Sequence, residues 1–114
     1  MCTQAQLKNI TDEISKSAKS ILGDKLHKII LYGSYARGDY TNESDVDIMV
    51  LADIKNEEIY PFDEKICETT SKLGMENKIM VSVFIKDKQF FDEYLHILPF
   101  YQNVIKDGVE LYAN

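Results

Sequence analysis

Residues 31–50 read LYGSYARGDYTNESDVDIMV, and this stretch decides the fold. It holds the end of one predicted strand, residues 26–32, and most of a second, residues 45–51. Apolar and β-branched side chains fill both segments, which is typical of strands buried in a sheet. The polar, turn-rich residues 35–44 form the only connection, and a connection this short favours antiparallel pairing of the two strands.

One helix before this stretch, and a helix and a strand after it, extend the predicted fold. Residues 3–22 carry apolar side chains at helical spacing, and residues 56–73 form a second segment of helical length that Gly74 is expected to end. Residues 78–85 (KIMVSVFI) are apolar and β-branched, as expected for a third strand. A strand–helix–strand crossover makes the second and third strands parallel if they share one sheet.

Short elements complete the predicted fold. Residues 88–95 are expected to form a short helix, and another is expected to begin near Pro99 with Phe100, Val104 and Ile105 as its apolar positions. The last apolar residues could add an edge strand. The sequence therefore predicts an α+β fold, with a small mixed sheet of three to four strands and helices mainly on one face.

Composition limits the class of protein. The chain has 114 residues, a net charge of −6, 45% hydrophobic and 28% charged residues, which predicts one globular domain over residues 1–114. The acidic balance makes nucleic acid an unexpected partner. The apolar runs are too short to span a bilayer. With only two cysteines, Cys2 and Cys67, no structural disulfide is expected, and the predicted location is the cytoplasm.

The turn after the first strand has the residues of a phosphate site. Gly33 lets a phosphate approach the backbone, and Ser34 adds a hydroxyl at the start of a predicted short helical turn, residues 35–37. Arg37 lies close enough in sequence to contact a phosphate tail. Tyr40 follows a few residues on and, like Tyr35, is a candidate to stack on a base.

The second strand begins with two carboxylates on one face. Asp45 and Asp47 alternate along the strand, so both side chains point the same way. Two like charges side by side repel and favour a cation between them. A hard divalent ion with oxygen ligands, most plausibly Mg²⁺, fits this pair.

Each of these features also has an ordinary interpretation. A glycine–serine pair after a strand is commonly just a turn, two aspartates at a strand end are commonly solvated, and Arg37 could be a surface arginine. The conjunction favours function, because two aligned aspartates beside the apolar run of residues 48–51 add little to stability.

At these residues the sequence resembles the nucleotidyltransferase superfamily that includes DNA polymerase beta, in particular its minimal bacterial members. The family signature is Gly-Ser, about ten residues, and Asp-x-Asp. Here Gly33-Ser34 is followed by residues 35–44 and then by Asp45 and Asp47. The resemblance covers most of the chain and implies the nucleotidyltransferase fold.

The resemblance also implies a reaction and a role for each residue. Asp45 and Asp47 are the expected catalytic residues and Mg²⁺ ligands, and Gly33 and Ser34 are expected to bind the phosphates of a nucleoside triphosphate, with ATP as the expected substrate. A nucleoside monophosphate, expected to be AMP, would pass to an acceptor hydroxyl while Arg37 steadies the leaving pyrophosphate.

One part of the family pattern is missing. The superfamily usually carries a third carboxylate on a neighbouring strand, and the inward polar position there is Ser82. Glu76 and Asp87 lie at either end of the predicted third strand and are weak candidates to replace it.

These features are compatible with three classes of function. The first is a transferase whose acceptor is a small helical partner of the HEPN type, as in toxin–antitoxin pairs. The alternative is a catalytically weak or inactive nucleotide-binding module that acts as an antitoxin by binding its partner. A regulatory nucleotide sensor is the third. Homo-oligomerisation stays open, and the small size of the chain favours an acceptor supplied from elsewhere.

Overall fold

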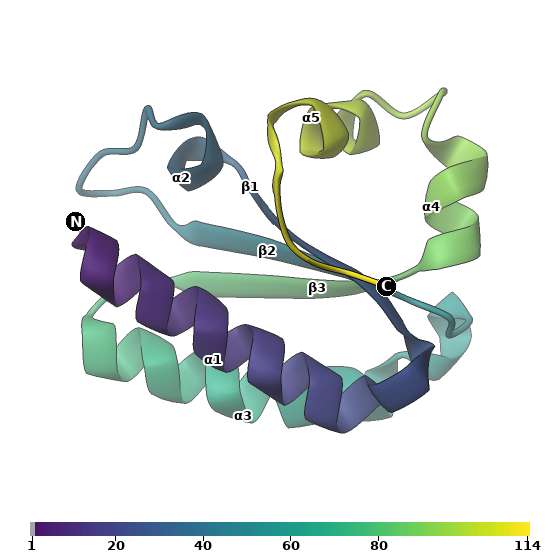
Figure 1. The fold of residues 1–114 in the computed structure, drawn as a ribbon, viewed down its shortest axis with the longest axis horizontal. Coiled ribbons are helices and arrows are strands. Elements are labelled where there is room, and N and C mark those ends of the chain that lie inside the picture. Colours follow the sequence, from purple (N-terminus) through teal and green to yellow (C-terminus); the bar gives the residue numbers. More distant parts are fainter. Residues whose placement is uncertain (1) are drawn as a thin grey trace.

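A computed structural model describes residues 2–114, and its centre is a four-stranded mixed sheet. The strand order is β3-β2-β1-β4, with β1 antiparallel to both β2 and β4 and with β2 parallel to β3 (Figure 1). The strands are β1 Leu26–Tyr32, β2 Val46–Ala52, β3 Val81–Asp87 and β4 Val109–Ala113. The predicted α+β class and both predicted pairings are confirmed.

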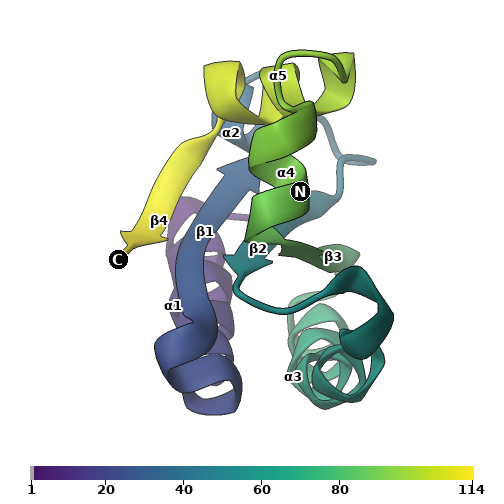
Figure 2. The same cartoon turned by 90° about the vertical axis from the view of Figure 1, so that its right-hand side faces the viewer.

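Two long helices, α1 (Gln4–Leu22) and α3 (Tyr60–Asn77), cover one face of the sheet (Figures 1 and 2). Thr3 begins α1 with a capping box: its side chain accepts from the Gln6 N–H at 3.1 Å, and the Gln6 side chain accepts from the Thr3 N–H. The buried side chains between these helices and the sheet form the main core. Its central members are Ile10, Ile14, Ala18, Ile29, Leu31, Val46, Ile48, Val50, Ile66 and Leu73.

Two short helices, α4 (Lys88–Tyr94) and α5 (Pro99–Asp107), lie over the opposite face (Figure 1). They enclose a second, smaller core with side chains from β1 and β2. Its members are Ile30, Tyr32, Met49, Leu51, Phe91, Tyr101 and Val104. The predicted alternation along β2 is therefore confirmed, because its residues divide between the two cores.

Three short elements complete the chain. They are the 3-10 turns Gly23–Lys25 and Asn56–Glu58 and the four-residue helix α2 (Ser34–Arg37), which follows β1 directly.

The predicted end of α3 at Gly74 is wrong. The helix continues to Asn77 and ends where Lys78 adopts a left-handed conformation with φ 54°. Gly74 has a different role: the Ile79 N–H returns to the Gly74 carbonyl at 3.1 Å, and a Cβ on Gly74 would lie 3.0 Å from the Ile79 oxygen. The glycine admits the returning chain, and β3 consequently starts at Val81 and not at residue 78.

The predicted apolar positions of α5 are partly wrong. Val104 is buried, but Phe100 is 49% and Ile105 44% exposed, and Tyr101 faces the core in their place. Pro99 begins the helix as predicted, so the helix is in the expected place but is rotated about its own axis relative to the prediction.

Cys2 and Cys67 are both free, as expected. Within residues 2–114, none of the helices combines the length and the apolar character that crossing a membrane requires.

Candidate active site

Antiparallel pairing brings the predicted phosphate turn and the predicted acidic strand together. Tyr32, the last residue of β1, is paired with Asp47 on β2, so Gly33 follows immediately beside Asp47. A Cβ on Gly33 would lie only 2.6 Å from Asp47 Oδ2. Gly33 has φ 78°, a conformation that favours glycine, so both its backbone and its lack of a side chain suit this contact.

The turn leads straight into α2. The Gly33 carbonyl accepts from the N–H groups of Ala36 and Arg37, both at 3.1 Å, and the Gly38 N–H closes the helix on the Ser34 carbonyl at 2.9 Å. The first N–H groups of an α-helix have no intrahelical acceptor. Ser34, the first residue of α2, therefore has a backbone N–H without an acceptor in the helix, and it directly follows Gly33, which contacts Asp47.

Three charged side chains influence one another at this end of the sheet. Burial raises the pKa of Asp47 above its ordinary value, the charge of Asp45 raises it further, and the guanidinium of Arg37 opposes both. Asp45 lies just before β2 and is exposed, whereas Asp47 is half-buried. Arg37 also pairs with Asp39, with 3.2 Å between Nε and Oδ2.

These carboxylates fit a divalent cation. Asp45 and Asp47 offer hard oxygen ligands from one strand end, and their repulsion is the kind that a bound cation relieves. Within residues 2–114, no third His, Cys, Asp or Glu joins them in a metal-binding group. Mg²⁺, which keeps several waters and needs few protein ligands, suits a site with two carboxylates.

The parallel pairing of β2 and β3 decides which residue takes the position beside Asp47. Ser82 is in register with Asp47, so the inward polar position predicted from sequence lies on the neighbouring strand directly beside Asp47.

The other two candidates for this position are wrong. Glu76 lies on α3, beneath the opposite face of the sheet, and its side chain is 3.9 Å from Lys72. Asp87 lies at the far end of β3, in register with Ala52, and caps α4 by accepting from the Gln89 N–H at 3.0 Å.

The prediction that Tyr35 is a candidate to stack on a base is wrong. Tyr35 is buried in the main core and stacks on the partly buried Tyr40, with 4.4 Å between ring centroids, so the Tyr35 ring is not presented to a base. The Cys2 N–H donates to the Tyr35 hydroxyl at 3.3 Å, which joins the residues before α1 to α2.

Sequence reasoning missed that Tyr32 lies at the site beside Asp47. Burial and the neighbouring Asp47 charge raise the pKa of Tyr32 to about 12, and its ring meets Phe100 edge-on at 5.7 Å. The signal that could have shown this was strand alternation, which places Tyr32 and Asp47 on one face.

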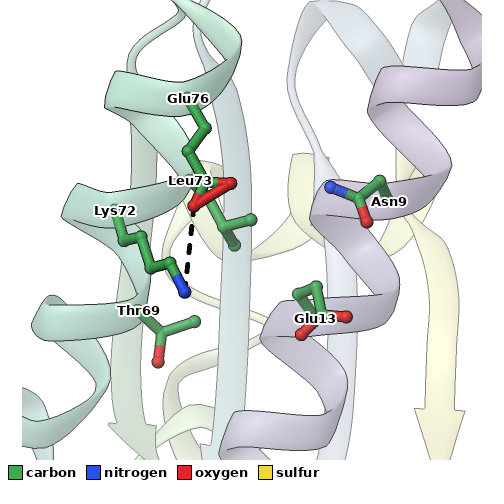
Figure 3. A pocket seen from close by; sticks show the side chains of 6 residues that line it. All are labelled: Asn9, Glu13, Thr69, Lys72, Leu73 and Glu76. Carbon is green, nitrogen blue, oxygen red and sulfur yellow. Dashed lines mark ion pairs between the residues drawn. The ribbon is translucent and has the colours of Figure 1, made fainter.

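A separate hollow of about 380 Å³ lies between α1 and α3 (Figure 3). Its lining includes Asn9, Glu13, Thr69 and the ion pair of Lys72 with Glu76. It lies between the two helices on the face of the sheet opposite α4 and α5, whereas Asp47 is on the α4 and α5 face, so the hollow is not part of the candidate active site.

The arrangement of sheet, helices and turn defines a class of fold. The chain is similar to the solved structure of a Sulfolobus solfataricus protein described as a "putative nucleotidyltransferase", with a TM-score of 0.60 at 23% identity over 97% of this chain and 86% of the other. A toxin–antitoxin structure with AMP-PNP gives a TM-score of 0.57 at 24% identity, and the toxin–antitoxin MntA-HpeT gives 0.56 at 22%. Each of these two covers 91% of this chain and 73% of the other. At this level of identity the likeness establishes the nucleotidyltransferase fold.

Sequence similarity identifies the family. Residues 11–109 match the nucleotidyltransferase domain, so the chain belongs to that family and is a transferase. Two Methanocaldococcus jannaschii proteins are similar, both named "Putative protein adenylyltransferase". One is 34% identical over 88% of this chain and 92% of its own length, and the other is 40% identical over 74% of this chain and 87% of its own length.

Proposed function

We propose that this nucleotidyltransferase transfers AMP from ATP to a hydroxyl group of a protein acceptor, and that Asp45 and Asp47 hold the Mg²⁺ ion that the reaction uses. One observation carries the proposal. The Asp47 carboxylate lies against Gly33 at the start of α2. The charge of Asp45, in the loop before β2, raises the pKa of the same carboxylate. The names of the M. jannaschii relatives support a protein acceptor, and the AMP-PNP in a structural neighbour supports an adenine nucleotide.

Each residue has a defined task in this reaction. Gly33 and Ser34 bind the β- and γ-phosphates through backbone N–H groups and a hydroxyl, and Arg37 neutralises charge on the departing pyrophosphate. Asp45 and Asp47 hold Mg²⁺, which when bound supplies positive charge to offset the charge that develops on the phosphate oxygens.

The chemistry is a single displacement at the α-phosphorus of ATP. A bond forms between the acceptor oxygen and this phosphorus, and the bond from the phosphorus to the oxygen bridging to the β-phosphate breaks. Pyrophosphate leaves with that bond's electron pair, and the hydroxyl proton passes to water. The contribution of the chain is largely to position the reactants and to balance charge.

For the acceptor, we propose a small helical protein of the HEPN type, with the chain acting in the cytoplasm as the antitoxin of a toxin–antitoxin pair. This choice is supported by the two structural neighbours that are described as toxin–antitoxin proteins.

A second function has one observation in its favour. Ser82 occupies the position beside Asp47, and a serine hydroxyl cannot act there as an anionic metal ligand or base. This supports a module that binds nucleotide and partner with little or no turnover.

The test uses ATP labelled at the α-phosphate, Mg²⁺ and the protein encoded beside this chain's gene. Label should move to that protein, and Asp45→Asn combined with Asp47→Asn should abolish the transfer. Asp24→Asn, at an exposed carboxylate at the other end of β1, is the matched control and should leave transfer intact. Tight partner binding without label, unchanged by the double substitution, would establish the binding module in place of the enzyme. Nucleotide binding that survives both the double substitution and Mg²⁺ removal would show that the site assignment is wrong.

A further inference from the structure

An exposed aromatic ring lies beside the candidate active site. Phe100, in the first turn of α5, is 49% exposed, and its ring meets the Tyr32 ring edge-on with 5.7 Å between centroids. Tyr32 is the strand partner of Asp47 and directly precedes Gly33. The Phe100 ring is therefore one side chain away from Asp47 and from the phosphate turn.

Phe100 also lies on the face of the sheet to which Asp47 points. Alternation along β2 puts Asp47 on the same face as Met49, and both Met49 and Tyr32 belong to the smaller core under α4 and α5. At the end of β1, where its arrow points in Figure 2, the chain places both α2 and α5. A nucleotide with its phosphates at the start of α2 therefore has α5 beside it.

Neighbouring rings hold the Phe100 ring in place. Tyr101 lies 5.9 Å from it between centroids, and Tyr101 in turn contacts the buried ring of Phe91 at 4.6 Å. Such aromatic contacts stabilise beyond the area that they bury. Because Tyr32 and Tyr101 already order the half-exposed ring, a planar ligand can stack on it at little cost in side-chain entropy.

The direction of the proposed reaction assigns the sides of the site. In an in-line displacement the acceptor oxygen enters opposite the pyrophosphate that leaves. Pyrophosphate is bound at Gly33 and Ser34, at the end of β1, so the acceptor approaches from the side of β3, the strand of Ser82. The nucleoside must keep clear of that path, which leaves it the side of α5.

The other exposed aromatic side chains are less well placed. Among residues 2–114, the exposed aromatic residues are Tyr60, Phe84, Tyr94 and Phe100. Tyr60 begins α3, under the opposite face of the sheet, and Tyr94 stacks on Phe90 at the end of α4. Phe84 lies on β3, on the side from which the acceptor approaches.

We propose that Phe100 stacks on the base of the bound nucleotide and so holds the nucleoside while Gly33 and Ser34 hold the phosphates. This inference rests on the proposed function, because it assigns the base-binding residue of that reaction. Stacking on an aromatic ring tolerates any base, since every base has a π face. Phe100 therefore supplies affinity for the nucleoside and does not select adenine over other bases.

The binding test compares a ligand that has a base with one that lacks it. The probes are ATP and tripolyphosphate, each with Mg²⁺, and binding to the full chain is measured by calorimetry. Phe100→Leu keeps an apolar side chain but removes the aromatic face. It should weaken ATP binding about tenfold, or about 1.4 kcal/mol, and leave tripolyphosphate binding unchanged. A general structural effect of the substitution would weaken both ligands.

Phe84→Leu is the matched control. Phe84 is 47% exposed, lies on the same face and is in register with Met49, one strand further from Tyr32. Its substitution should leave ATP binding unchanged. If Phe84→Leu weakens ATP binding and Phe100→Leu does not, the base lies on the β3 side and the inference is wrong.

A spectroscopic readout does not depend on a loss of binding. The chain has no tryptophan, so Phe100→Trp introduces a single fluorescent side chain at the proposed stacking position. Indole also stacks on bases, and this variant should bind ATP as tightly as the parent chain does. Saturation with ATP should quench the tryptophan emission, whereas tripolyphosphate should leave it unchanged. The emission of Phe84→Trp should respond to neither ligand.

The outcomes separate the stacking inference from the proposed function. If the parent chain binds both ligands and Phe100→Leu changes neither affinity, or lowers both equally, only the stacking inference is wrong. Tryptophan emission in Phe100→Trp that stays constant at saturating ATP would also overturn the stacking inference alone. If neither ligand binds to the parent chain with Mg²⁺, the proposed function fails, and the stacking inference fails with it.

Discussion

The carboxylate of Asp47 lies directly against the Cα of Gly33, so that a Cβ on Gly33 would come within 2.6 Å of Oδ2. This contact joins the phosphate turn after β1 to the acidic strand β2. It is possible because Gly33 has no side chain and adopts φ 78°.

Gly33→Ala should therefore disable the site. The methyl group must displace Asp47, and the left-handed backbone adds a cost on the order of 1 kcal/mol. We expect loss of nucleotidyl transfer and of ATP binding, measured by calorimetry. Gly23→Ala is the matched control, because Gly23 has φ 54° and ψ −127°, near the φ 78° and ψ −159° of Gly33, but its Cβ would meet nothing within 4 Å. Equal losses in both variants would mean that backbone strain, and not the contact with Asp47, explains the effect.

Asp47→Asn should stabilise the fold while it abolishes transfer. Burial and the Asp45 charge raise the folded-state pKa of Asp47, so its contribution to stability is present below the unfolded pKa, about 4, and is lost as pH rises through the folded value. At neutral pH the charged Asp47 is therefore destabilising. The Tm of Asp47→Asn should exceed that of the parent at pH 7, and the difference should vanish below about pH 4. A lower Tm at pH 7 would contradict this.

Chelation should remove the folding stability that Mg²⁺ adds when it binds to Asp45 and Asp47. Mg²⁺ bound only by the folded chain raises its stability by about 2.7 kcal/mol at a hundredfold excess over Kd. We expect Mg²⁺ to raise Tm, EDTA to remove the increase, and Asp45→Asn with Asp47→Asn to make Tm insensitive to both. Asp24→Asn should respond like the parent, and a Mg²⁺ response that persists in the double variant would place the ion elsewhere.

Ser82→Asp should strengthen the metal site. The new carboxylate would lie in register with Asp47, and a third oxygen anion is expected to lower the Mg²⁺ concentration for half-maximal transfer about tenfold. Ser82→Asn is the control, because asparagine is similar in size to aspartate but neutral. It should not lower the Mg²⁺ concentration for half-maximal transfer. If both variants lower transfer equally, the position beside Asp47 does not serve the metal.

Gly108→Ala tests the packing at the start of β4. A Cβ there would overlap the Val104 carbonyl oxygen and lie 2.5 Å from Ile30 Cγ2, although φ is an ordinary −72°. We expect a loss of about 2–3 kcal/mol in the free energy of unfolding in urea. Gly23→Ala again serves for comparison, since its backbone is strained for alanine but an added Cβ overlaps nothing. A loss below about 0.5 kcal/mol would show that α5 shifts easily away from β1.

Much of the site could be predicted because its determinants are local. Alternation along residues 45–51 placed Asp45 and Asp47 on one face, and the short connection from Gly33 predicted antiparallel pairing, which brings the turn back beside Asp47. The partners of Tyr35 could not be predicted in this way. Its hydrogen bond to Cys2 joins segments 33 residues apart in the sequence, whose proximity depends on how α1 packs under the sheet.

The sequence alone determined the order of the elements, the pairing of the first three strands and the residues of the phosphate turn and acidic pair, because side-chain periodicity and turn length are short-range properties. Only the tertiary structure decided what lies beside them. α3 runs on past Gly74, and the chain returns over that glycine before β3 begins. That path sets the register that places Ser82 beside Asp47 and takes Glu76 and Asp87 away from it. Register between strands separated by a long helix depends on how the helix packs, and no local pattern encodes it.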